Sequence, residues 1–379
     1  MNPVKIERLR IEPGRRMLVT SDVHGNLSHL RGVLQKAQFS DADVLFIVGD
    51  LIEKGPQSLQ TLRYVMQLCK AGNVYPLLGN VDAWRLQMIR DIAPENAQGF
   101  YDYLLSCRAW KGSCFFDEMT NELGCLCRSP EDVLRMKEPV LTRFQAEFSF
   151  LDNLPTVIET QNYTFVHGGL RDRNVQENSK RGLFELLKYD RFMETPHRFE
   201  KYVIVGHWPV SLYGKEYMQL NPVIDREKKI LSIYGGCGIK TFGQLNLLLI
   251  PDTDCPIDDV SFTCYDSLPV YRAKTPQEAS ANPSLILWTN NEIQVLEKGA
   301  DESRVRHLST GRELWIPNAF LSNDARCRDY SDYALPVSAG DELSLILRTP
   351  KGCFVKKNGV VGWYYGEMEA VDQTIRKEP

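Results

Sequence analysis

Six side chains able to bind metal ions stand at the ends of apolar stretches in this sequence. They are Asp22, His24, Asp50, Asn80, His167 and His207, with glycines close by. Two carboxylates with imidazole and amide donors, and no thiolate, suit Mn²⁺, Fe or Zn²⁺. The set is large enough for two ions that share one bridging carboxylate. Two such ions can hold a hydroxide between them and clamp a phosphoryl group, so the pattern predicts phosphoester chemistry.

The first two of these residues, Asp22 and His24, are separated by Val23. On an extended backbone, alternate side chains point to the same side, so both could reach one metal ion. Taken alone, the triplet is more typical of a strand that ends in a solvated acid and a turn glycine. The metal-site interpretation therefore depends on the residues that follow the same pattern further along the chain.

The stretches before these residues read as strands that alternate with helices. Predicted strands cover 17–20, 44–48 and 73–78, with amphipathic helical patterns between them. This alternation implies a parallel sheet, in which ligands collect beyond the carboxyl ends of the strands. Two later strands, 163–166 and 202–205, each end beside one of the candidate histidines. The sequence therefore predicts that all six side chains meet at one edge of the fold.

The remainder of the first 265 residues surrounds this arrangement. Residues 83–154 are aromatic and helix-leaning, and we expect them to cap the site. Two further apolar runs, 230–234 and 245–250, alternate with polar residues or turns and are typical of antiparallel strands in a second sheet. A catalytic domain is therefore predicted over residues 1–265.

Five ordered motifs resemble those of the calcineurin-like metallophosphoesterases. They are Asp22-x-His24-Gly25-Asn26, Gly49-Asp50 through Lys54-Gly55, Gly79-Asn80-Val81-Asp82, Val166-His167-Gly168-Gly169 and Val205-Gly206-His207-x-Pro209. The chain is most similar to the branch that contains bacterial phosphoprotein phosphatases and symmetrical diadenosine tetraphosphate hydrolases. The resemblance implies an α/β fold, a sandwich of two mixed β-sheets flanked by helices.

The resemblance also implies how the candidate ligands divide between two divalent ions, Mn²⁺ first and Fe or Zn²⁺ as alternatives. One ion would be held by Asp22, His24 and Asp50. The other would be held by Asp50, Asn80, His167 and His207. A hydroxide that bridges the ions would attack phosphorus in line.

Two positions depart from the family pattern. Lys54 stands where the family has an arginine that grips phosphate, and lysine keeps the charge but lacks the bidentate fork. Val81 stands where the family has a histidine that protonates the leaving oxygen, and Asp82 would have oriented that histidine. General acid catalysis contributes roughly 10²- to 10⁴-fold in rate. We therefore expect a handicapped enzyme, one with another acid, or one that acts on phosphodiesters.

A second phosphate-gripping arginine is also expected from the resemblance. Arg191 resembles it, although the spacing differs by one residue. Arg171 and Arg173, which follow the motif at His167, are rivals for the same role. Solvated arginines are an equally good interpretation of each.

The last hundred residues change character, with short alternating strands separated by turns. Two blocks, 266–322 and 323–379, resemble SH3 domains and are predicted to be small β-barrels. We expect them to recruit a protein or peptide partner. Packing on the catalytic domain or dimerisation are alternatives, because neither block shows the paired tryptophans of a proline-rich peptide groove.

Composition excludes several other classes of function. The net charge of −4 over 379 residues shows no basic bias, which argues against nucleic acid as a partner. The sequence shows no targeting segment and no apolar run near 18 residues, so a membrane-spanning or secreted protein is not expected. Ten scattered cysteines without a CxxC pair are typical of reduced thiols, and a cytoplasmic protein is predicted.

The sequence therefore predicts a two-metal phosphoesterase, with Lys54 and Arg191 holding the non-bridging phosphate oxygens. The main prediction for the substrate is a serine/threonine phosphoprotein. A phosphodiesterase or a dinucleoside-tetraphosphate hydrolase is the alternative, because Val81 replaces the acid histidine. A metal-binding pseudophosphatase scaffold is the alternative from another class.

Overall fold

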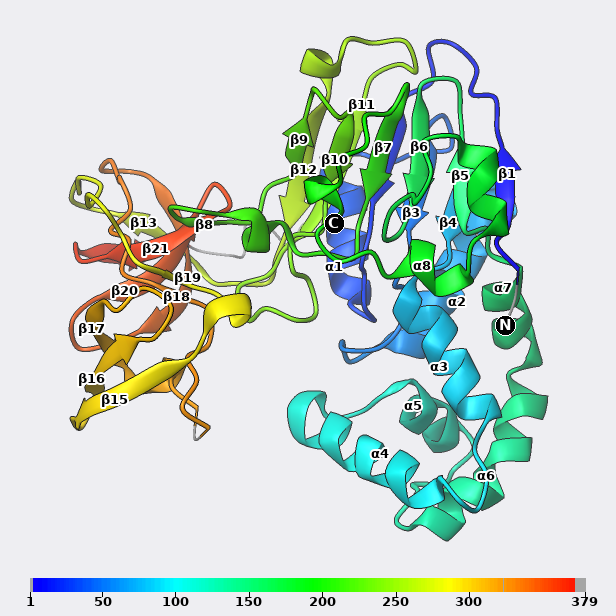
Figure 1. The fold of residues 1–379 in the computed structure, drawn as a ribbon, viewed down its shortest axis with the longest axis horizontal. Coiled ribbons are helices and arrows are strands. Elements are labelled where there is room, and N and C mark those ends of the chain that lie inside the picture. Colours follow the sequence, from blue (N-terminus) through cyan, green and yellow to red (C-terminus); the bar gives the residue numbers. More distant parts are fainter. Residues whose placement is uncertain (1–2, 323, 372–379) are drawn as a thin grey trace. The chain divides into compact units, whose positions relative to one another are not determined.

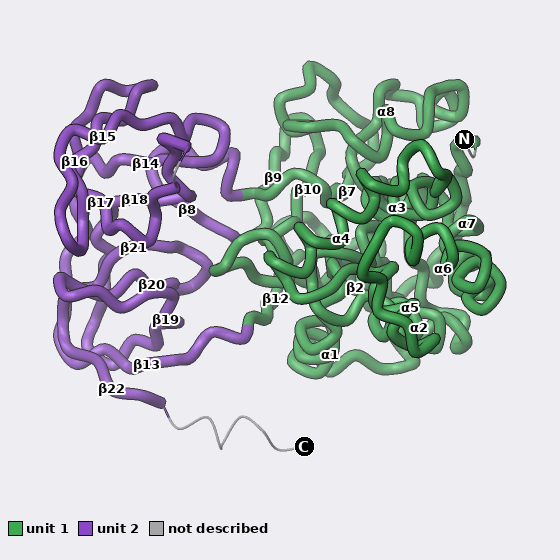
Figure 2. Tube along the Cα trace, turned by 90° about the horizontal axis from the view of Figure 1, so that it is seen from below, with its two compact units in different colours: residues 1–210, 222–266 green, residues 211–221, 267–379 purple. Residues whose placement is uncertain are grey.

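The computed structural model describes residues 3–322 and 324–371 of the chain (Figure 1). The described residues form two compact units (Figure 2). The first contains residues up to 210 together with 222–266, and the second contains 211–221 together with residues from 267 onward. The six candidate metal ligands all belong to the first unit.

One sheet of the first unit carries the strands that were predicted to be parallel. Its order is β12 (Ser261–Tyr265), β11 (Leu245–Ile250), β2 (Met17–Thr20), β3 (Val44–Val48) and β4 (Val74–Leu77). Strands β2, β3 and β4 run parallel, with Val19 opposite Phe46 and Phe46 opposite Tyr75. Every residue of β2 and β3 is buried, as expected for apolar strands that are covered on both faces.

The other sheet supplies the two later histidines. Its order is β1 (Ile6–Arg8), β5 (Val157–Glu159), β6 (Tyr163–Val166), β7 (Tyr202–Val205), β10 (Ile230–Ser232) and β9 (Val223–Asp225). Strands β6, β7 and β10 are parallel neighbours. Strand β5 pairs antiparallel with β6, and β9 pairs antiparallel with β10. Both sheets of the unit are therefore mixed, as predicted.

The prediction for the runs 230–234 and 245–250 was partly wrong. Strand β11 is antiparallel, but it pairs with β2 in the first sheet, and β10 lies parallel to β7 in the second. Both strands are almost completely buried. Because residues on both faces of these strands are buried, the sequence pattern could not show which sheet each strand joins.

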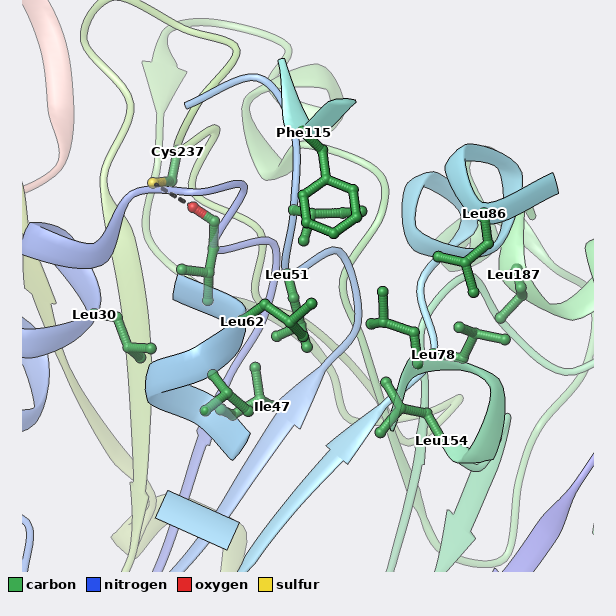
Figure 3. Packing of buried hydrophobic residues seen from close by; sticks show 14 of the residues in the cluster. Leu30, Ile47, Leu51, Leu62, Leu78, Leu86, Phe115, Leu154, Leu187 and Cys237 are labelled. Atoms are coloured by element: carbon green, nitrogen blue, oxygen red, sulfur yellow. Dashed lines mark hydrogen bonds between the residues drawn. The ribbon is translucent and has the colours of Figure 1, made fainter. Parts of the chain in front are cut away.

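The two sheets pack face to face, and helices cover the outer face of the first. Between the sheets, the rings of Phe46 and Phe165 stack with centroids 4.0 Å apart. On the helical side, α1 (Leu27–Lys36) and α2 (Ser58–Leu68) bury Leu30 and Leu62 in a cluster with Ile47 (Figure 3). The layers together form the predicted α/β sandwich.

A helical insertion separates β4 from β5. It comprises α3 (Asn80–Arg90), α4 (Ala97–Lys111), α5 (Phe115–Glu122), α6 (Pro130–Arg143) and α7 (Gln145–Asn153). The prediction of helices over 83–154 is confirmed. Glu118 of α5 also accepts hydrogen bonds from the backbone N–H groups of Ser58 and Leu59, 2.8 Å each. These N–H groups lack partners within helix α2, so the insertion completes the start of a helix of the core.

The second unit consists of short antiparallel strands. The largest sheet has the order β22 (Met368–Ala370), β13 (Val270–Ala273), β19 (Glu342–Arg348), β20 (Cys353–Lys357), β21 (Val360–Tyr364) and β8 (Met218–Gln219). Smaller sheets pair β14 (Leu285–Ile286) with β18 (Tyr330–Ser331), and β15 (Ile293–Lys298), β16 (Glu302–His307) and β17 (Glu313–Pro317). Strand β13, from the first expected module, pairs with β19 and β22 of the second. One sheet therefore contains strands from both expected modules, 266–322 and 323–379, and the SH3-like barrels remain a prediction.

Candidate metal centre

The candidate ligands stand where the backbone turns sharply after the strands. The φ angles are 53° at Asp22, 49° at His24, 53° at Asp50 and 59° at His207, all in the left-handed region. The expected extended backbone at Asp22 and His24 was therefore wrong. A non-glycine residue in this region costs of order 1–3 kcal/mol, and such residues cluster at functional sites. The turns bring side chains from separate strands into one place.

Glycine makes room for one of these side chains. A Cβ atom added to Gly206, the residue before His207, would collide with the Asp22 carboxylate. The His207 N–H donates a hydrogen bond to Oδ2 of the same carboxylate, 3.0 Å away. The ends of β2 and β7 are thereby tied together across the two sheets.

Asp22, His24 and Asp50 form a completely buried group. Their ligand atoms all lie within 4.8 Å of one another. Nε2 of His24 is 3.8 Å from Oδ1 of Asp22 and 3.5 Å from Oδ2 of Asp50. This is the set that the family resemblance assigns to the first metal ion.

The other three residues meet on the opposite side of Asp50. Nε2 of His167 is 3.5 Å from Asp50 Oδ1 and 2.9 Å from Asn80 Oδ1. Nδ1 of His207 lies 2.9 Å from the same Asn80 oxygen. The structure thus brings all six candidate ligands together, with Asp50 between the two groups. A bridging role for Asp50 requires this position, and the role itself stays a prediction.

Hydrogen bonds fix which nitrogen of each central histidine faces the group. In each ring one nitrogen contacts an oxygen that can only accept, so that nitrogen carries the proton. The pairs are His24 Nδ1 with Ile52 O at 3.3 Å, His167 Nδ1 with Val48 O at 2.9 Å, and His207 Nε2 with Asp190 Oδ1 at 2.7 Å. In His24 and His207, whose pKa values are lowered, the other nitrogen is left with a lone pair, which faces carboxylate oxygens and Lys54 in His24 and the Asn80 oxygen in His207. A metal ion placed among these atoms would bind both the ring nitrogens and the oxygens. Metal-bound histidines usually have this arrangement, with the other ring nitrogen donating to a fixed acceptor.

Electrostatics at the centre point to a missing positive charge. Burial, followed by the charge of Asp50, raises the pKa of Asp22 to about 7. Burial and the charge of Lys54 lower the pKa of His24 to about 3, and burial lowers that of His207 to about 4. Oδ1 of Asp22 is buried, and no group among the described residues forms a hydrogen bond with it. An orphaned buried carboxylate oxygen beside the neutral imidazoles of His24 and His207 fits a metal ion well.

Asp82 holds together loops that carry candidate ligands, and its carboxylate does not face the group. Its Oδ1 accepts from the N–H groups of Leu51 and Ile52 at 2.9 and 3.2 Å, and its Oδ2 accepts from Gly79 at 3.1 Å. These bonds join the loop after β3 to the start of α3. We interpret Asp82 as a positioning residue, because its carboxylate is engaged by the backbone.

Lys54 reaches the centre, as predicted. Its Nζ lies 3.4 Å from Nε2 of His24. The loop that carries it is unusual, because Glu53 and Lys54 both have positive φ angles, 69° and 65°. Two consecutive left-handed residues without glycine require strong contacts to hold them.

The candidate arginines are not brought into the buried group. Arg191 is half exposed, 3.8 Å from Glu194, and its guanidinium lies 5.9 Å from the Trp208 ring centroid. Arg171 stacks on Tyr189 at 3.6 Å. Arg173 lines a separate cavity. A phosphate-gripping role for Arg191 stays a prediction.

Two residues at the site were missed by sequence reasoning. Asp190, which hydrogen bonds to His207, directly precedes the arginine that was singled out. Glu53, beside Lys54, is buried and engages the helical insertion. Asp190 and Glu53 are acids beside residues that were singled out, and this was the available signal. Their partners lie elsewhere in the sequence, so the contacts could not be predicted.

No helix in the described parts of the chain has the length and apolar character needed to cross a membrane.

Comparison with known proteins supports the same chemistry. Residues 15–236 match the family model described as calcineurin-like phosphoesterase. A symmetrical bis(5'-nucleosyl)-tetraphosphatase of Photorhabdus laumondii is 41% identical over 86 residues, which cover 22% of this chain and 30% of that protein. The corresponding protein of Buchnera aphidicola from Schizaphis graminum is 33% identical over 89 residues, which cover 23% and 32%. The matches span only about a third of these curated relatives.

One solved structure, of a putative diadenosine tetraphosphatase, shares 17% sequence identity with this chain. The alignment covers 69% of this chain and 98% of that one, with a TM-score of 0.43.

Proposed function

Because the chain belongs to the calcineurin-like phosphoesterase family and is a metal-dependent hydrolase, we propose that it cleaves a substrate whose leaving group is itself a phosphate. A dinucleoside tetraphosphate is the preferred example. The curated relatives are named for that activity, which favours the alternative from the sequence over the main prediction of a phosphoprotein phosphatase.

The observation that carries this proposal is the aliphatic side chain of Val81. Its backbone N–H donates to Asp50 Oδ1 at 2.8 Å, so the residue lies beside the metal group. Its side chain is buried and has no proton to donate. A serine alkoxide is a poor leaving group that needs protonation, whereas a nucleoside phosphate leaves as a stable anion. The site is therefore better suited to a phosphoanhydride than to phosphoserine.

The histidines of the centre do not replace the missing acid. Each donates its ring proton to a fixed acceptor, and burial keeps the pKa values of His24 and His207 far below neutral. His167 has a pKa raised to about 9, against the effect of its burial, by Asp50 and Asp22, but its proton-bearing nitrogens face Val48 O and the ligand oxygens. None of the three is positioned as a general acid toward solvent.

The remaining roles follow from the geometry. Asp22, His24, Asp50, Asn80, His167 and His207 would hold two divalent ions, which supply Lewis-acid charge and a nucleophilic hydroxide when bound. Lys54 is the cation that reaches this group, and it would bind a phosphate oxygen through its ammonium.

The test is turnover by the purified full chain with Mn²⁺, Fe²⁺ or Zn²⁺ against three substrates. Diadenosine tetraphosphate should be cleaved with a higher kcat/KM than a phosphoserine peptide, with p-nitrophenyl phosphate as the reference for a good leaving group. Asp50→Asn should abolish all three activities. A higher kcat/KM for the phosphoserine peptide would restore the phosphoprotein phosphatase prediction. Metal binding without any turnover would favour the scaffold.

For the second unit we keep the proposal that it recruits a protein or peptide partner. The unit exposes Trp288 and Trp315, more than 40% each, which is the kind of surface that aromatic-rich docking sites use. Pull-down with and without paired Trp288→Ala and Trp315→Ala substitutions tests it. Retention of every captured partner by the variant would contradict it.

A further inference from the structure

Trp84 of helix α3 exposes a large apolar side chain close to the candidate metal centre. Its exposed fraction is 56%, whereas Val81, Leu86 and Ile89 of the same helix are buried. The larger part of this residue is thus open to water rather than packed in the core. A single exposed apolar side chain is common on protein surfaces, so the position of Trp84 decides whether it has a role.

Helix geometry places Trp84 on the side of α3 that carries a candidate ligand. Asn80 is four residues earlier, and residues at this spacing lie on the same face of a helix. With 3.6 residues per turn, Trp84 points about 40° from Asn80 and about 60° from Val81, between the two. Oδ1 of Asn80 lies 2.9 Å from ring nitrogens of both His167 and His207. Because long side chains on a helix lean toward its N-terminus, the indole leans toward the turn that carries Asn80.

A second chain of contacts links Trp84 to the loop on the other side of the centre. The guanidinium of Arg85 lies 5.9 Å from the centroid of the Trp84 ring, and its Nε lies 2.7 Å from the Glu53 carboxylate. The next residue, Lys54, reaches within 3.4 Å of His24. The start of α3 and this loop therefore both place Trp84 at the edge of the candidate metal centre.

The indole and the centre offer two different kinds of contact to one ligand. Metal ions and the Lys54 ammonium would bind phosphate oxygens. The exposed indole offers a flat apolar face, on which nucleobases stack. A phosphate group has no flat apolar surface and cannot use this face.

We propose that Trp84 stacks on the base of a nucleotide whose phosphates bind at the metal centre. The residue would thereby select nucleotides over phosphate compounds that have no base. This inference rests on the proposed function and adds to it the residue that recognises the base. Because every base has a π face, stacking on Trp84 would accept guanine as well as adenine.

The test is isothermal titration of ADP and of inorganic pyrophosphate into the full chain loaded with Mn²⁺. The free Mn²⁺ concentration is held constant, since both ligands also bind Mn²⁺. Pyrophosphate has the two phosphates of ADP without the base, so the ratio of the two dissociation constants reports the contribution of the base. In Trp84→Ala, the ratio of ADP to pyrophosphate should rise roughly tenfold, because stacking is lost. Trp84→Phe keeps an aromatic face and should show a smaller rise.

Trp110→Ala is the matched control. Trp110 of α4 belongs to the same helical insertion and is also 56% exposed. It likewise lies beside a cation, with Nζ of Lys111 4.8 Å from its ring centroid. No candidate ligand precedes it at helical spacing, so this variant should keep the wild-type ratio.

Four results would overturn the proposal. They are no ADP binding to the wild type, an unchanged ratio in Trp84→Ala, loss of both ligands in that variant, and an equal rise in Trp110→Ala. Binding is measured without turnover, so its outcome is separate from that of the proposed function. Preference for the phosphoserine peptide, together with the rise in Trp84→Ala, would contradict only the proposed function. Preference for diadenosine tetraphosphate with an unchanged ratio would contradict only the role of Trp84.

Discussion

Nε of Arg85 lies 2.7 Å from Oε1 of Glu53, and both side chains are buried. The other carboxylate oxygen of Glu53 accepts a hydrogen bond from the Tyr103 hydroxyl at 2.8 Å. The Arg85 guanidinium in turn lies 4.0 Å from the centroid of the Tyr103 ring. The loop that carries Lys54 is thus anchored to α3 and α4 of the helical insertion by one carboxylate.

Glu53→Gln should destabilise the protein by about 3–5 kcal/mol, because it leaves the Arg85 charge buried without a counter-ion. Urea unfolding followed by circular dichroism measures the effect. Tyr103→Phe is the control that keeps the ion pair and removes only a hydrogen bond, at a cost of about 0.5–1.5 kcal/mol. Equal decreases in the free energy of unfolding from the two substitutions would mean that the charge pair contributes no more than a single hydrogen bond.

Lys54→Ala should lower kcat/KM by roughly tenfold or more, because a charge-assisted contact to phosphate is worth about 1.5–3 kcal/mol. Its metal content, measured by plasma mass spectrometry, should equal that of the wild type. Lys54→Arg should retain more activity than Lys54→Ala. A loss of bound metal in Lys54→Ala would show instead that the lysine supports the metal centre.

Val81→His should increase turnover of a phosphoserine peptide more than that of p-nitrophenyl phosphate, since only the poor leaving group needs a proton. Val81→Ala controls for the space around the substrate. Similar gains on both substrates in Val81→His would show that protonation of the leaving group does not limit the rate.

Mn²⁺ should stabilise the folded protein, because the ligand set is assembled only in the native state. At a free concentration 100 times its dissociation constant, a single bound ion adds about 2.7 kcal/mol to the free energy of unfolding. Thermal unfolding with EDTA or with Mn²⁺ checks this. Asp22→Asn should reduce the shift, and a full shift in that variant would place the stabilising ion elsewhere.

Stability at low pH should depend on Asp43. Its two oxygens lie 2.8 Å from Nε and Nη2 of Arg16, and Oδ2 also accepts from the Ser40 N–H. Burial raises the pKa of Asp43, but these bonds hold it below its ordinary value of 3.8. A depressed folded-state pKa contributes stability above pH 3.8, and that stability is lost as the pH falls through the folded-state pKa.

Asp43→Asn should therefore lower the free energy of unfolding at pH 7 by about 1.5–3 kcal/mol. The difference from the wild type should shrink as the pH falls below 3.8. Asp41→Asn, at an exposed neighbouring position, is the control. A difference that stays constant down to strongly acidic pH would exclude the titration of Asp43 as its cause.

The sequence was sufficient to single out the six candidate ligands because they follow five apolar strands, with Asp22 and His24 both after β2. The predicted strands at 17–20, 44–48 and 163–166 exist, and the ends of 17–20 and 44–48 lie at one edge because these two strands are parallel neighbours. Left-handed backbone at Asp22 and His24 could not be predicted, because the sign of φ there depends on contacts with other strands. The His207 N–H bond to the Asp22 carboxylate spans 185 residues.

Long-range pairing explains the remaining differences. The Arg85 partner of Glu53 lies in the insertion, whose helices were predicted without their tertiary contacts. In the second unit, Tyr271 of β13 lies opposite Leu343 of β19. These residues are far apart in the sequence, so no local pattern could predict that they pair. Local periodicity predicts that a strand exists, and only the assembled core decides what it pairs with.

The candidate metal centre draws on both sheets of the sandwich. Asp22, His24, Asp50 and Asn80 follow strands of one sheet, whereas His167 and His207 follow strands of the other. Bound ions would therefore act as a cross-link that closes a long segment of chain, as a disulfide does in a protein without metals. Loss of metal would then loosen the attachment of one sheet to the other, and proteolysis between residues 80 and 167 would split the ligand set between two fragments.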